Sequence, residues 1–538
     1  MSRSLTRRMR PGRRGPWIRA LAAALTLGAL VWAVPSAGAA GDGSGLPEAL
    51  DGILADARMA GGAESVVVAD AKSGDVIYQH AAGDRLMPAS NTKLLTSAAA
   101  MALLGPGYRF PTDVLTGGSR HGSVLAGDLY LRGTGDPTIL AGDYDALAAR
   151  LADTGIRRVT GKLVADDTRF DDQRLGRSWA ADDEASYYSA QISALSLAPN
   201  TDYDTGTVIA NIAPGAAPGD PAKVTLTPPN HYVHLHVTAT TAPAGDGGGV
   251  TVDRAHGTND ITVAGTVPVG ADPDMEWVSV WNPTGYAAAV FRDALARHGI
   301  RVTGPTSLGG ATPDGAEPLA THDSMPLKDL LIPFLKLSNN MHAEILTKAM
   351  GVKAAGRGTW ADGLAAINGY VKGLGIDTGQ FRQVDGSGLS RMDVVPANVF
   401  AELLSAVRAE PWFADWYRAL PVACDPDRFV GGTLRSRMCG TPAALNARGK
   451  TGSLTGADTL TGYVTDAGGR ELVYSVLLNN YLAEDVDDIE DAVVVTLASS
   501  SAGNAVPVAP RSLRHGHGGA GHPDGSGLEC AWQKPRLC

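Results

Sequence analysis

The chain has 538 residues and a formal net charge of −10, so its length predicts more than one domain. Its 66 Gly and 32 Pro stay below the roughly 25–30% typical of low-complexity chains, which indicates a globular protein. The acidic balance argues against a nucleic-acid partner, because neutralising phosphates requires a basic face.

The first 40 residues carry seven Arg and no acidic residue. The apolar run that follows the arginines, 20–34, is shorter than the roughly 20 residues of a membrane-spanning helix, and Ala37-x-Ala39 fits a signal-peptidase site. We therefore predict a signal peptide over 1–39, an exported protein and no membrane span after cleavage. An uncleaved anchor is the alternative, and a pair of arginines near the start leaves the choice between the general and the twin-arginine export routes open.

A β-hairpin is predicted next, because apolar runs at 65–70 and 75–79 flank a turn that contains glycine. A helix follows from Pro88 to Leu104, with Gly105 after its end. From residue 110 to about 318, short apolar runs are divided by Gly, Pro, Asp and Asn, which predicts about 200 β-rich residues.

Helical periodicity returns over 326–346, 363–374 and 396–420, and a final hairpin pairs 460–464 with 471–478. We therefore predict one α/β (α+β) domain, built from both ends of the chain and interrupted by a large β-rich insertion. The expected boundaries are 40–112 and 319–500 for the split domain, 113–200 and 283–318 for an inserted domain II, 201–282 for an inserted domain III, and 501–538 for a tail rich in Gly, Pro and His.

Four cysteines fit an oxidising compartment, because an even number can pair completely. We predict the sequence-local pairs Cys424–Cys439 and Cys530–Cys538, one of three possible connectivities. None of the cysteines has the CxxC spacing, and the histidines of 231–236 lack further ligands nearby, so no metal site is predicted.

Ser90 and Lys93 lie at positions i and i+3, on one face of the first turn of the predicted apolar helix. Burial disfavours a charged amine, so we expect a lowered pKa for Lys93, which suits a base for the neighbouring hydroxyl. The field at the helix N-terminus favours a developing negative charge. Taken alone, this common motif is explained better by an N-cap serine beside a solvated lysine.

Two further motifs follow, Ser338-Asn339-Asn340 in a helical stretch and Lys450-Thr451-Gly452 before the final hairpin. Each has an ordinary explanation by itself, as a polar cluster on a helix surface and as a turn at a strand end. Ser-x-x-Lys, Ser-x-Asn and Lys-Thr-Gly in this order, however, are the motif set of penicillin-binding proteins and class A β-lactamases.

The chain resembles the D-alanyl-D-alanine carboxypeptidase/endopeptidases of the class C low-molecular-mass penicillin-binding proteins. About 245 residues separate Lys93 from Ser338, and a large insertion between these motifs marks that family. The segments 133–138, 188–195, 385–391 and 432–438 are also similar to family segments, so the resemblance covers 46 to about 500. It implies a catalytic domain like that of serine β-lactamases and transpeptidases, an antiparallel sheet flanked by helices, with large β-rich inserted domains.

The resemblance implies roles for five catalytic residues. Ser90 is the nucleophile that attacks the carbonyl between two D-amino acids at the end of a peptidoglycan stem peptide, and Lys93 is its general base. Ser338 relays a proton to the leaving amine, Asn340 bonds the substrate amide, and Lys450 adds a second positive charge.

The resemblance also implies a substrate-binding set. The backbone N–H groups of Ser90 and Ser453 form an oxyanion hole, on a strand that contains Gly452, and the hydroxyls of Thr451 and Ser453 bind the terminal carboxylate. The remaining contacts, with the side chain of the stem peptide, involve Asp183, Tyr188, Leu389, Arg391 and Leu454.

β-Lactams mimic the terminal dipeptide, so we expect them to acylate Ser90, and the resemblance implies no cofactor and a place in the cell wall. The chain has neither a Glu-x-x-Leu-Asn pattern nor a Tyr-x-Asn second motif, which argues against a β-lactamase. A serine β-lactamase or esterase on the same scaffold and a catalytically silent wall-binding protein are the alternatives. Carboxypeptidase and endopeptidase action are not separated, because both cut after a D-Ala and differ only in the leaving group.

Overall fold

The structure is a computed structural model that describes residues 45–501 and 504–513. The predicted signal peptide, most of the tail and the predicted pair Cys530–Cys538 lie outside the described residues.

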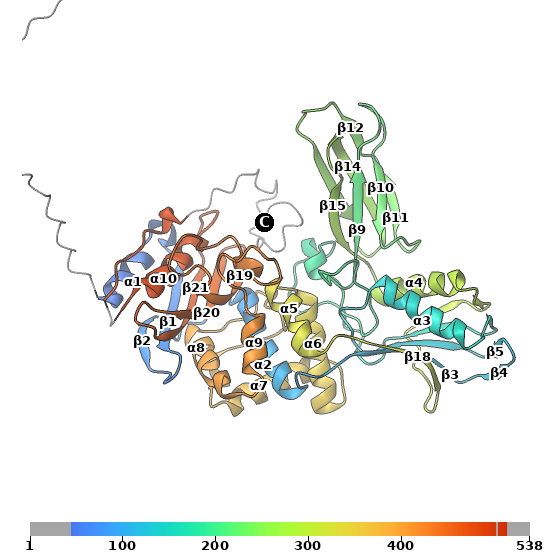
Figure 1. The fold of residues 1–538 in the computed structure, drawn as a ribbon, viewed down its shortest axis with the longest axis horizontal. Coiled ribbons are helices and arrows are strands. Elements are labelled where there is room, and N and C mark those ends of the chain that lie inside the picture. Colours follow the sequence, from blue (N-terminus) through green and yellow to red (C-terminus); the bar gives the residue numbers. More distant parts are fainter. Residues whose placement is uncertain (1–44, 502–503, 514–538) are drawn as a thin grey trace, which may run out of the picture. The chain divides into compact units, whose positions relative to one another are not determined.

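A five-stranded antiparallel sheet, in the order β19-β20-β21-β1-β2, joins the two ends of the described chain. Val66 in β1 lies opposite Val476 in β21, so the blue and red segments of Figure 1 run side by side. Both predicted hairpins are confirmed, β1 with β2 and β20 with β21. The strands are β1 (Ala63–Asp70), β2 (Val76–His80), β19 (Arg448–Leu454), β20 (Ala457–Thr465) and β21 (Glu471–Asn479).

Helices cover both faces of this sheet, as predicted. Alternate residues of a strand point to opposite faces, so Val66 and Val68 pack in the core with α1 (Leu46–Leu54) and α10 (Asp487–Ser499), whereas Val67 belongs to the core on the other face. The helices of that second core are α2 (Thr92–Leu103), α5 (Leu327–Lys336), α6 (Asn340–Ala355), α7 (Trp360–Gly373), α8 (Ala397–Ala406) and α9 (Phe413–Ala419).

The continuous helix expected over 326–346 is wrong at one place. It divides into α5 and α6 at Ser338, whose φ of 56° lies in the left-handed region. The side chain of Asn339 then caps α6 by accepting a hydrogen bond from the His342 N–H at 3.3 Å. The second motif therefore lies at a helix junction, where a tight turn can present polar groups.

The stretch from β3 to β18 contains four sheets, as its β-rich sequence predicts, and two helices that the sequence analysis did not predict. The helices, α3 (Ala141–Asp153) and α4 (Pro283–Arg297), pack against each other. The five-stranded sheet has the order β17-β8-β6-β3-β18 and the four-stranded sheet β16-β7-β5-β4. Their strands are β3 (Pro111–Thr116), β4 (Ser119–His121), β5 (Val124–Ala126), β6 (Leu129–Gly133), β7 (Arg158–Val159), β8 (Leu163–Asp166), β16 (Arg301–Val302), β17 (Thr306–Leu308) and β18 (Glu317–Asp323).

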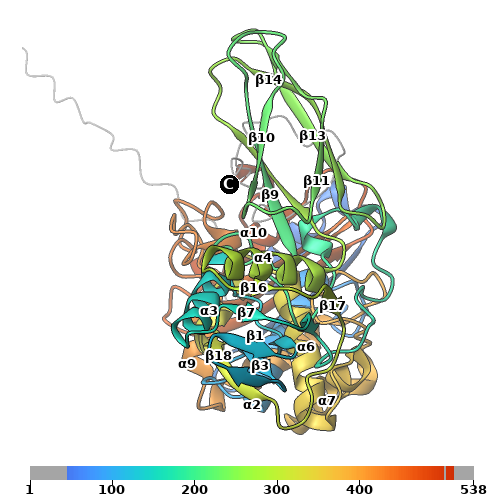
Figure 2. The same ribbon diagram turned by 90° about the vertical axis from the view of Figure 1, so that its right-hand side faces the viewer.

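Two smaller sheets lie within 207–279, one in the order β10-β9-β15 and one in which β14 pairs with β11, β12 and β13 (Figure 2). Their strands are β9 (Thr207–Ala213), β10 (Lys223–Thr227), β11 (His234–Val237), β12 (Thr240–Ala242), β13 (Gly249–Arg254), β14 (Asp260–Pro268) and β15 (Asp274–Ser279). The boundaries of domains II and III stay predictions.

The predicted disulfide Cys424–Cys439 is confirmed, with Cα atoms 4.9 Å apart. Within 45–501 and 504–513, no helix has both the length and the apolar character that a membrane span requires. In the same described part of the chain, no cluster of three or more His, Cys, Asp or Glu side chains is arranged to hold a metal ion.

Candidate active site

The start of α2 brings Ser90 and Lys93 together as their spacing predicts. Lys93 Nζ lies 2.7 Å from Ser90 Oγ, and the two residues are 0% and 3% exposed. Ser90 lies in a 3₁₀ turn, Ala89–Asn91, that runs directly into α2, and the preceding Ala89 has a φ of 44°. A non-glycine residue in this region is strained, which is common where a fold holds a reactive group in a fixed position.

Two further acceptors surround the Lys93 amine. Its Nζ atom donates to Asn340 Oδ1 at 2.7 Å and to the Ser387 carbonyl at 3.0 Å. The Asn340 amide is oriented by its other end, because Nδ2 donates to the Tyr188 carbonyl at 2.9 Å. A hydrogen bond thereby joins Lys93 and Asn340, which are 247 positions apart in the sequence.

This arrangement fixes the amine beside the nucleophile. The Ser387 carbonyl and Asn340 Oδ1 can only accept hydrogen bonds, so they orient the Lys93 amine. The same nitrogen donates to Ser90 Oγ at 2.7 Å, a distance that permits proton transfer between the two groups. Complete burial of the amine opposes its charged form.

The third motif lies directly against the nucleophile. A Cβ atom built on Gly452 would lie 2.7 Å from the Ser90 backbone nitrogen and 2.4 Å from Thr459 Oγ1, so only glycine allows β19 to approach this closely. Lys450 is fully buried, and its Nζ donates to the Thr451 carbonyl at 2.7 Å. The strand thus brings Lys-Thr-Gly to the beginning of α2.

The remaining predicted residues lie on segments that border this centre. Tyr188, whose carbonyl holds Asn340, donates its hydroxyl to Asp183 Oδ1 at 2.9 Å. Arg391 Nη1 donates to the Thr455 carbonyl at 3.1 Å, at the turn that directly follows Ser453 and Leu454, the last two residues of β19. Leu389 follows Gly388, where an added Cβ would lie 1.8 Å from the Ala89 carbonyl oxygen. Ser338 is fully buried at the α5–α6 junction, two residues before Asn340.

A buried carboxylate that the sequence analysis missed supports the loop beneath the amine. Glu344 accepts hydrogen bonds from the N–H groups of Gly386 and Ser387, both at 2.8 Å, and from Trp360 Nε1 at 2.7 Å. Burial, together with the neighbouring Asp385 carboxylate, raises the pKa of Glu344 to about 7. Glu344 therefore holds the peptide whose carbonyl contacts Lys93.

A signal for this support was present in the sequence. Asn340, Glu344 and Lys348 recur every four residues, a spacing that places them on one face of α6, and all three are at most 3% exposed. The loop itself is closed by Asp385, which accepts from the N–H groups of Gly388 and Ser390, both at 2.7 Å. A polar stripe on a helix that is buried on all sides marks contacts with other buried polar groups.

Comparison with known proteins gives consistent matches. The D-Ala-D-Ala carboxypeptidase 3 (S13) family matches residues 46–500. A D-alanyl-D-alanine carboxypeptidase of Actinomadura sp. (strain R39) is 42% identical over 492 residues, which cover 90% of this chain and 89% of that protein. D-alanyl-D-alanine carboxypeptidase DacB of Haemophilus influenzae is 27% identical over 406 residues, 75% of this chain and 82% of that protein.

Solved structures agree with the sequence matches. The crystal structure of penicillin binding protein 4 (dacB) from Haemophilus influenzae has a TM-score of 0.70 and 25% identity, and the match covers 81% of this chain and 94% of that one. A second structure of that protein, complexed with a β-lactam, has a TM-score of 0.66 with the same identity and coverage. The matched residues 46–500 include all three motifs.

Proposed function

Because the chain belongs to the D-Ala-D-Ala carboxypeptidase 3 (S13) family of serine peptidases, we propose that Ser90 is the nucleophile with which it cleaves the terminal D-Ala-D-Ala bond of peptidoglycan stem peptides. The observation that carries this proposal is the position of Lys93 Nζ, 2.7 Å from both Ser90 Oγ and Asn340 Oδ1 in a buried site. No cofactor enters the reaction.

The first step is acylation. Lys93 takes the proton of Ser90 as Oγ attacks the carbonyl carbon, and the C–N bond breaks with release of D-Ala to leave an acyl ester on Ser90. Ser338, the first residue of the Ser-x-Asn motif, passes a proton to the leaving amine, and Asn340 bonds the substrate amide. Water then hydrolyses the ester, which regenerates the Ser90 hydroxyl.

The substrate lies along β19 in this proposal. β19 is an edge strand of the β19-β20-β21-β1-β2 sheet. The edge of a sheet offers unpaired backbone groups to an extended peptide. The N–H groups of Ser90 and Ser453 stabilise the oxyanion, and loss of one such donor typically costs about 10²–10³ in rate. Thr451 and Ser453 bind the terminal carboxylate near Lys450, and Asp183, Tyr188, Leu389, Arg391 and Leu454 contact the rest of the peptide.

Mass spectrometry of the intact protein after incubation with penicillin tests these assignments. We expect one stable adduct on Ser90, no adduct in Ser90→Ala, and acylation slowed by about 10²–10⁴ in Lys93→Ala, because general-base catalysis contributes that much. Lys372→Ala, an exposed lysine of α7, is the matched control and should be acylated like the wild type. An adduct on Ser338, or wild-type acylation in Lys93→Ala, would contradict the proposal.

Export to the cell wall is part of the same proposal. A disulfide persists in an oxidising compartment, so the Cys424–Cys439 pair supports a location outside the cytoplasm. Whether the enzyme also cleaves cross-linked peptides is decided by digesting muropeptides and separating loss of D-Ala from loss of dimers by mass.

A further inference from the structure

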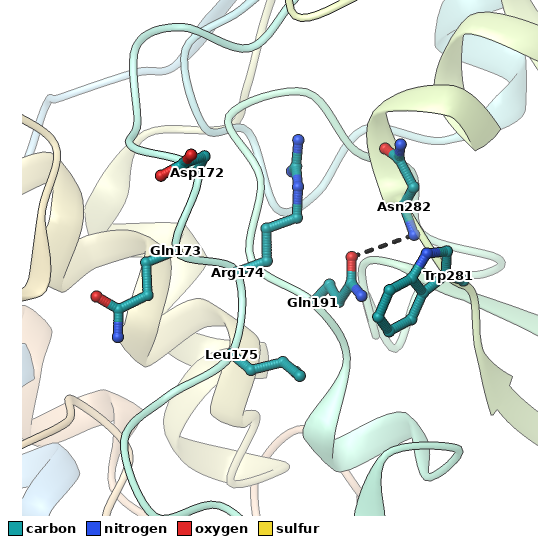
Figure 3. Close-up of a pocket in the computed structure, with 7 residues that line it drawn as sticks. All are labelled: Asp172, Gln173, Arg174, Leu175, Gln191, Trp281 and Asn282. Atoms are coloured by element: carbon teal, nitrogen blue, oxygen red, sulfur yellow. Dashed lines mark hydrogen bonds between the residues drawn. The ribbon is translucent and has the colours of Figure 1, made fainter. Parts of the chain in front are cut away.

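A cavity of about 400 Å³ opens beside the segment that supports Asn340 (Figure 3). Its lining combines polar side chains with one leucine and one indole ring, namely Asp172, Gln173, Arg174, Leu175, Gln191, Trp281 and Asn282. The segment 188–192 joins it to the active site, because Tyr188 holds Asn340 and the Ile192 N–H donates to the Arg174 carbonyl at 2.8 Å. No residue that lines this cavity takes part in the proposed reaction.

Trp281, which supplies the indole, is anchored through its backbone. Its backbone N–H donates to Asn259 Oδ1 at 2.8 Å, and its carbonyl accepts from Asn259 Nδ2 at 3.0 Å. The buried guanidinium of Arg254 lies 5.9 Å from the ring centroid. The indole offers a flat apolar surface to the cavity, and its contact with Arg254 limits the side-chain entropy lost on binding.

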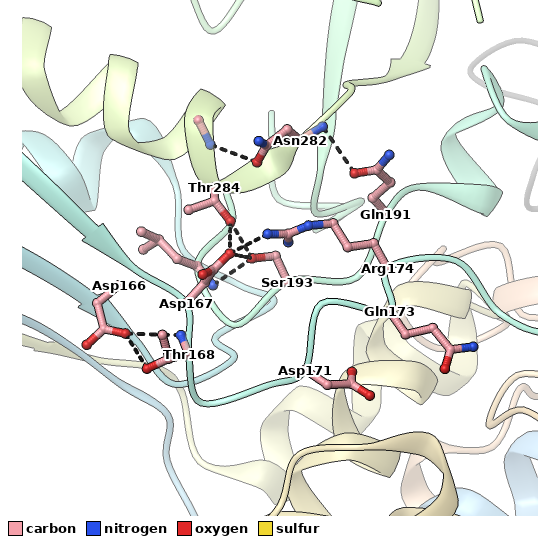
Figure 4. A network of polar contacts seen from close by, with 12 residues as sticks. Asp166, Asp167, Thr168, Asp171, Gln173, Arg174, Gln191, Ser193, Asn282 and Thr284 are labelled. Atoms are coloured by element: carbon pink, nitrogen blue, oxygen red, sulfur yellow. Dashed lines mark hydrogen bonds and ion pairs between the residues drawn. The ribbon is translucent and has the colours of Figure 1, made fainter. Parts of the chain in front are cut away.

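The cavity wall is also fixed by polar contacts. Gln191, 7% exposed, accepts a hydrogen bond from the Asn282 N–H at 3.2 Å through Oε1, which leaves its Nε2 donors for a ligand. Arg174 pairs with Asp167 at 2.5 Å, within the network that Figure 4 shows. With its guanidinium paired and Asp172 on the rim, the site is not built for a phosphate or another strong anion.

The cavity lies within reach of a bound stem peptide. Tyr188 and Gln191 are three residues apart, so their Cα atoms are separated by at most about 11 Å. The scissile bond of a five-residue stem peptide lies four residues from the sugar that carries the stem, and four extended residues span up to about 14 Å.

We propose that this cavity binds the N-acetylated amino sugars of the peptidoglycan strand, an inference that rests on the proposed function. A sugar ring has a C–H face that packs on an indole, and its hydroxyl and acetamido groups exchange hydrogen bonds with the carboxamides of Gln173, Gln191 and Asn282 and with the Asp172 carboxylate. The enzyme thus recognises the glycan as well as the stem peptide.

Steady-state hydrolysis of a stem pentapeptide, with and without its N-acetylglucosaminyl-N-acetylmuramyl disaccharide, tests the proposal. We expect the wild type to prefer the disaccharide substrate, and Trp281→Leu to lower kcat/KM for that substrate by about tenfold while the free pentapeptide is unaffected. Gln173→Ala, at an exposed lining residue, should reduce the same preference without a risk to folding. Tyr130→Leu, a half-buried aromatic residue of β6 outside the cavity, is the matched control.

The alternatives have separate signatures. Equal loss for both substrates and for penicillin acylation would mean that Trp281 only supports the active site, and equal preference in wild type and variants would mean that the cavity binds no sugar; either result overturns the inference. Absence of both pentapeptide hydrolysis and Ser90 acylation in the wild type would instead contradict the proposed function.

Discussion

At the scale of single residues, the candidate site depends on which atoms surround one amine. Three acceptors lie within 3.0 Å of Lys93 Nζ, and two of them have no proton to give. Asn340 and the Ser387 carbonyl are in turn fixed by Tyr188 and Glu344. Glu344 is a positioning residue, because it contacts the loop and not the reacting atoms.

Glu344→Gln tests this positioning. A glutamine has the same size as the glutamate, but its N–H₂ group faces one of the loop N–H groups, so one buried hydrogen bond is lost. Such a loss costs about 1–3 kcal/mol. We therefore expect acylation of Ser90 to slow by about tenfold or more. Glu344→Asp, which restores the charge, should recover part of the rate. Glu48→Gln, at an exposed position of α1, is the control. Wild-type acylation in Glu344→Gln would exclude the positioning role.

Glu344→Gln should also change how the stability of the protein depends on pH. Burial raises the folded-state pKa of Glu344 to about 7, above its ordinary value of 4.5, so the folded protein binds more protons than the unfolded chain between these values. The contribution of Glu344 to stability is therefore fully present below about pH 4.5 and is lost as the pH rises through 7. Urea unfolding from pH 5 to 8 should show a smaller loss of unfolding free energy in Glu344→Gln than in the wild type. An identical pH slope in both proteins would contradict this assignment.

At the scale of elements, the site forms where β19, the start of α2 and the α5–α6 junction meet. The edge strand β19 approaches the Ser90 backbone only because residue 452 is glycine, and the 385–390 loop approaches Ala89 only because residue 388 is glycine with a φ of 82°. Both contacts leave no room for a Cβ atom. Close approach of backbones explains why glycines lie beside the motifs.

Gly452→Ala should therefore remove activity while the protein still folds. The added methyl group pushes β19 away from the nucleophile, and a displacement of about 1 Å costs roughly 10² in rate. Gly369→Ala, in the middle of α7 with no atom within 4 Å of its added Cβ, is the matched control and should stabilise the protein by up to about 1 kcal/mol. Penicillin acylation and thermal unfolding of both variants measure the two effects. Normal acylation by Gly452→Ala would show that the approach of β19 is not needed.

At the scale of the whole molecule, the small sheets of 207–279 contact the segment 183–185, which we propose lies beside the bound stem peptide. Arg254 at the end of β13 donates from Nη2 to Glu184 Oε1 at 2.8 Å, one residue after Asp183, and both partners are at most 6% exposed. The Ser279 N–H, at the end of β15, also donates to the Ala185 carbonyl at 3.0 Å. The small sheets of 207–279 thus hold the segment 183–185, which we propose contacts the stem peptide.

Arg254→Met should uncouple that segment. It leaves the Glu184 carboxylate buried without its main charged partner, which typically costs about 3–5 kcal/mol of stability. We expect a lower melting temperature and a raised KM for stem peptides, with most of the stability recovered in Arg254→Met combined with Glu184→Gln. Arg301→Met, an exposed arginine of β16, is the control. A double variant as unstable as the single one would show that the ion pair is not the cause.

Local sequence patterns predicted the family, the site motifs and much of the local structure. Ser90 and Lys93 meet because a helix brings residues i and i+3 together, both hairpins follow from alternation around a turn, and the three motifs in order predict the family. Only the tertiary structure decided which distant groups complete the site, such as the Ser387 carbonyl on Lys93, 294 residues away, and the cavity beside Trp281. Periodicity in the sequence reflects contacts within one helical turn or one pair of strands. Packing between segments that are far apart in the chain decides the rest, which includes the break at Ser338, the helices α3 and α4 and the burial of Glu344.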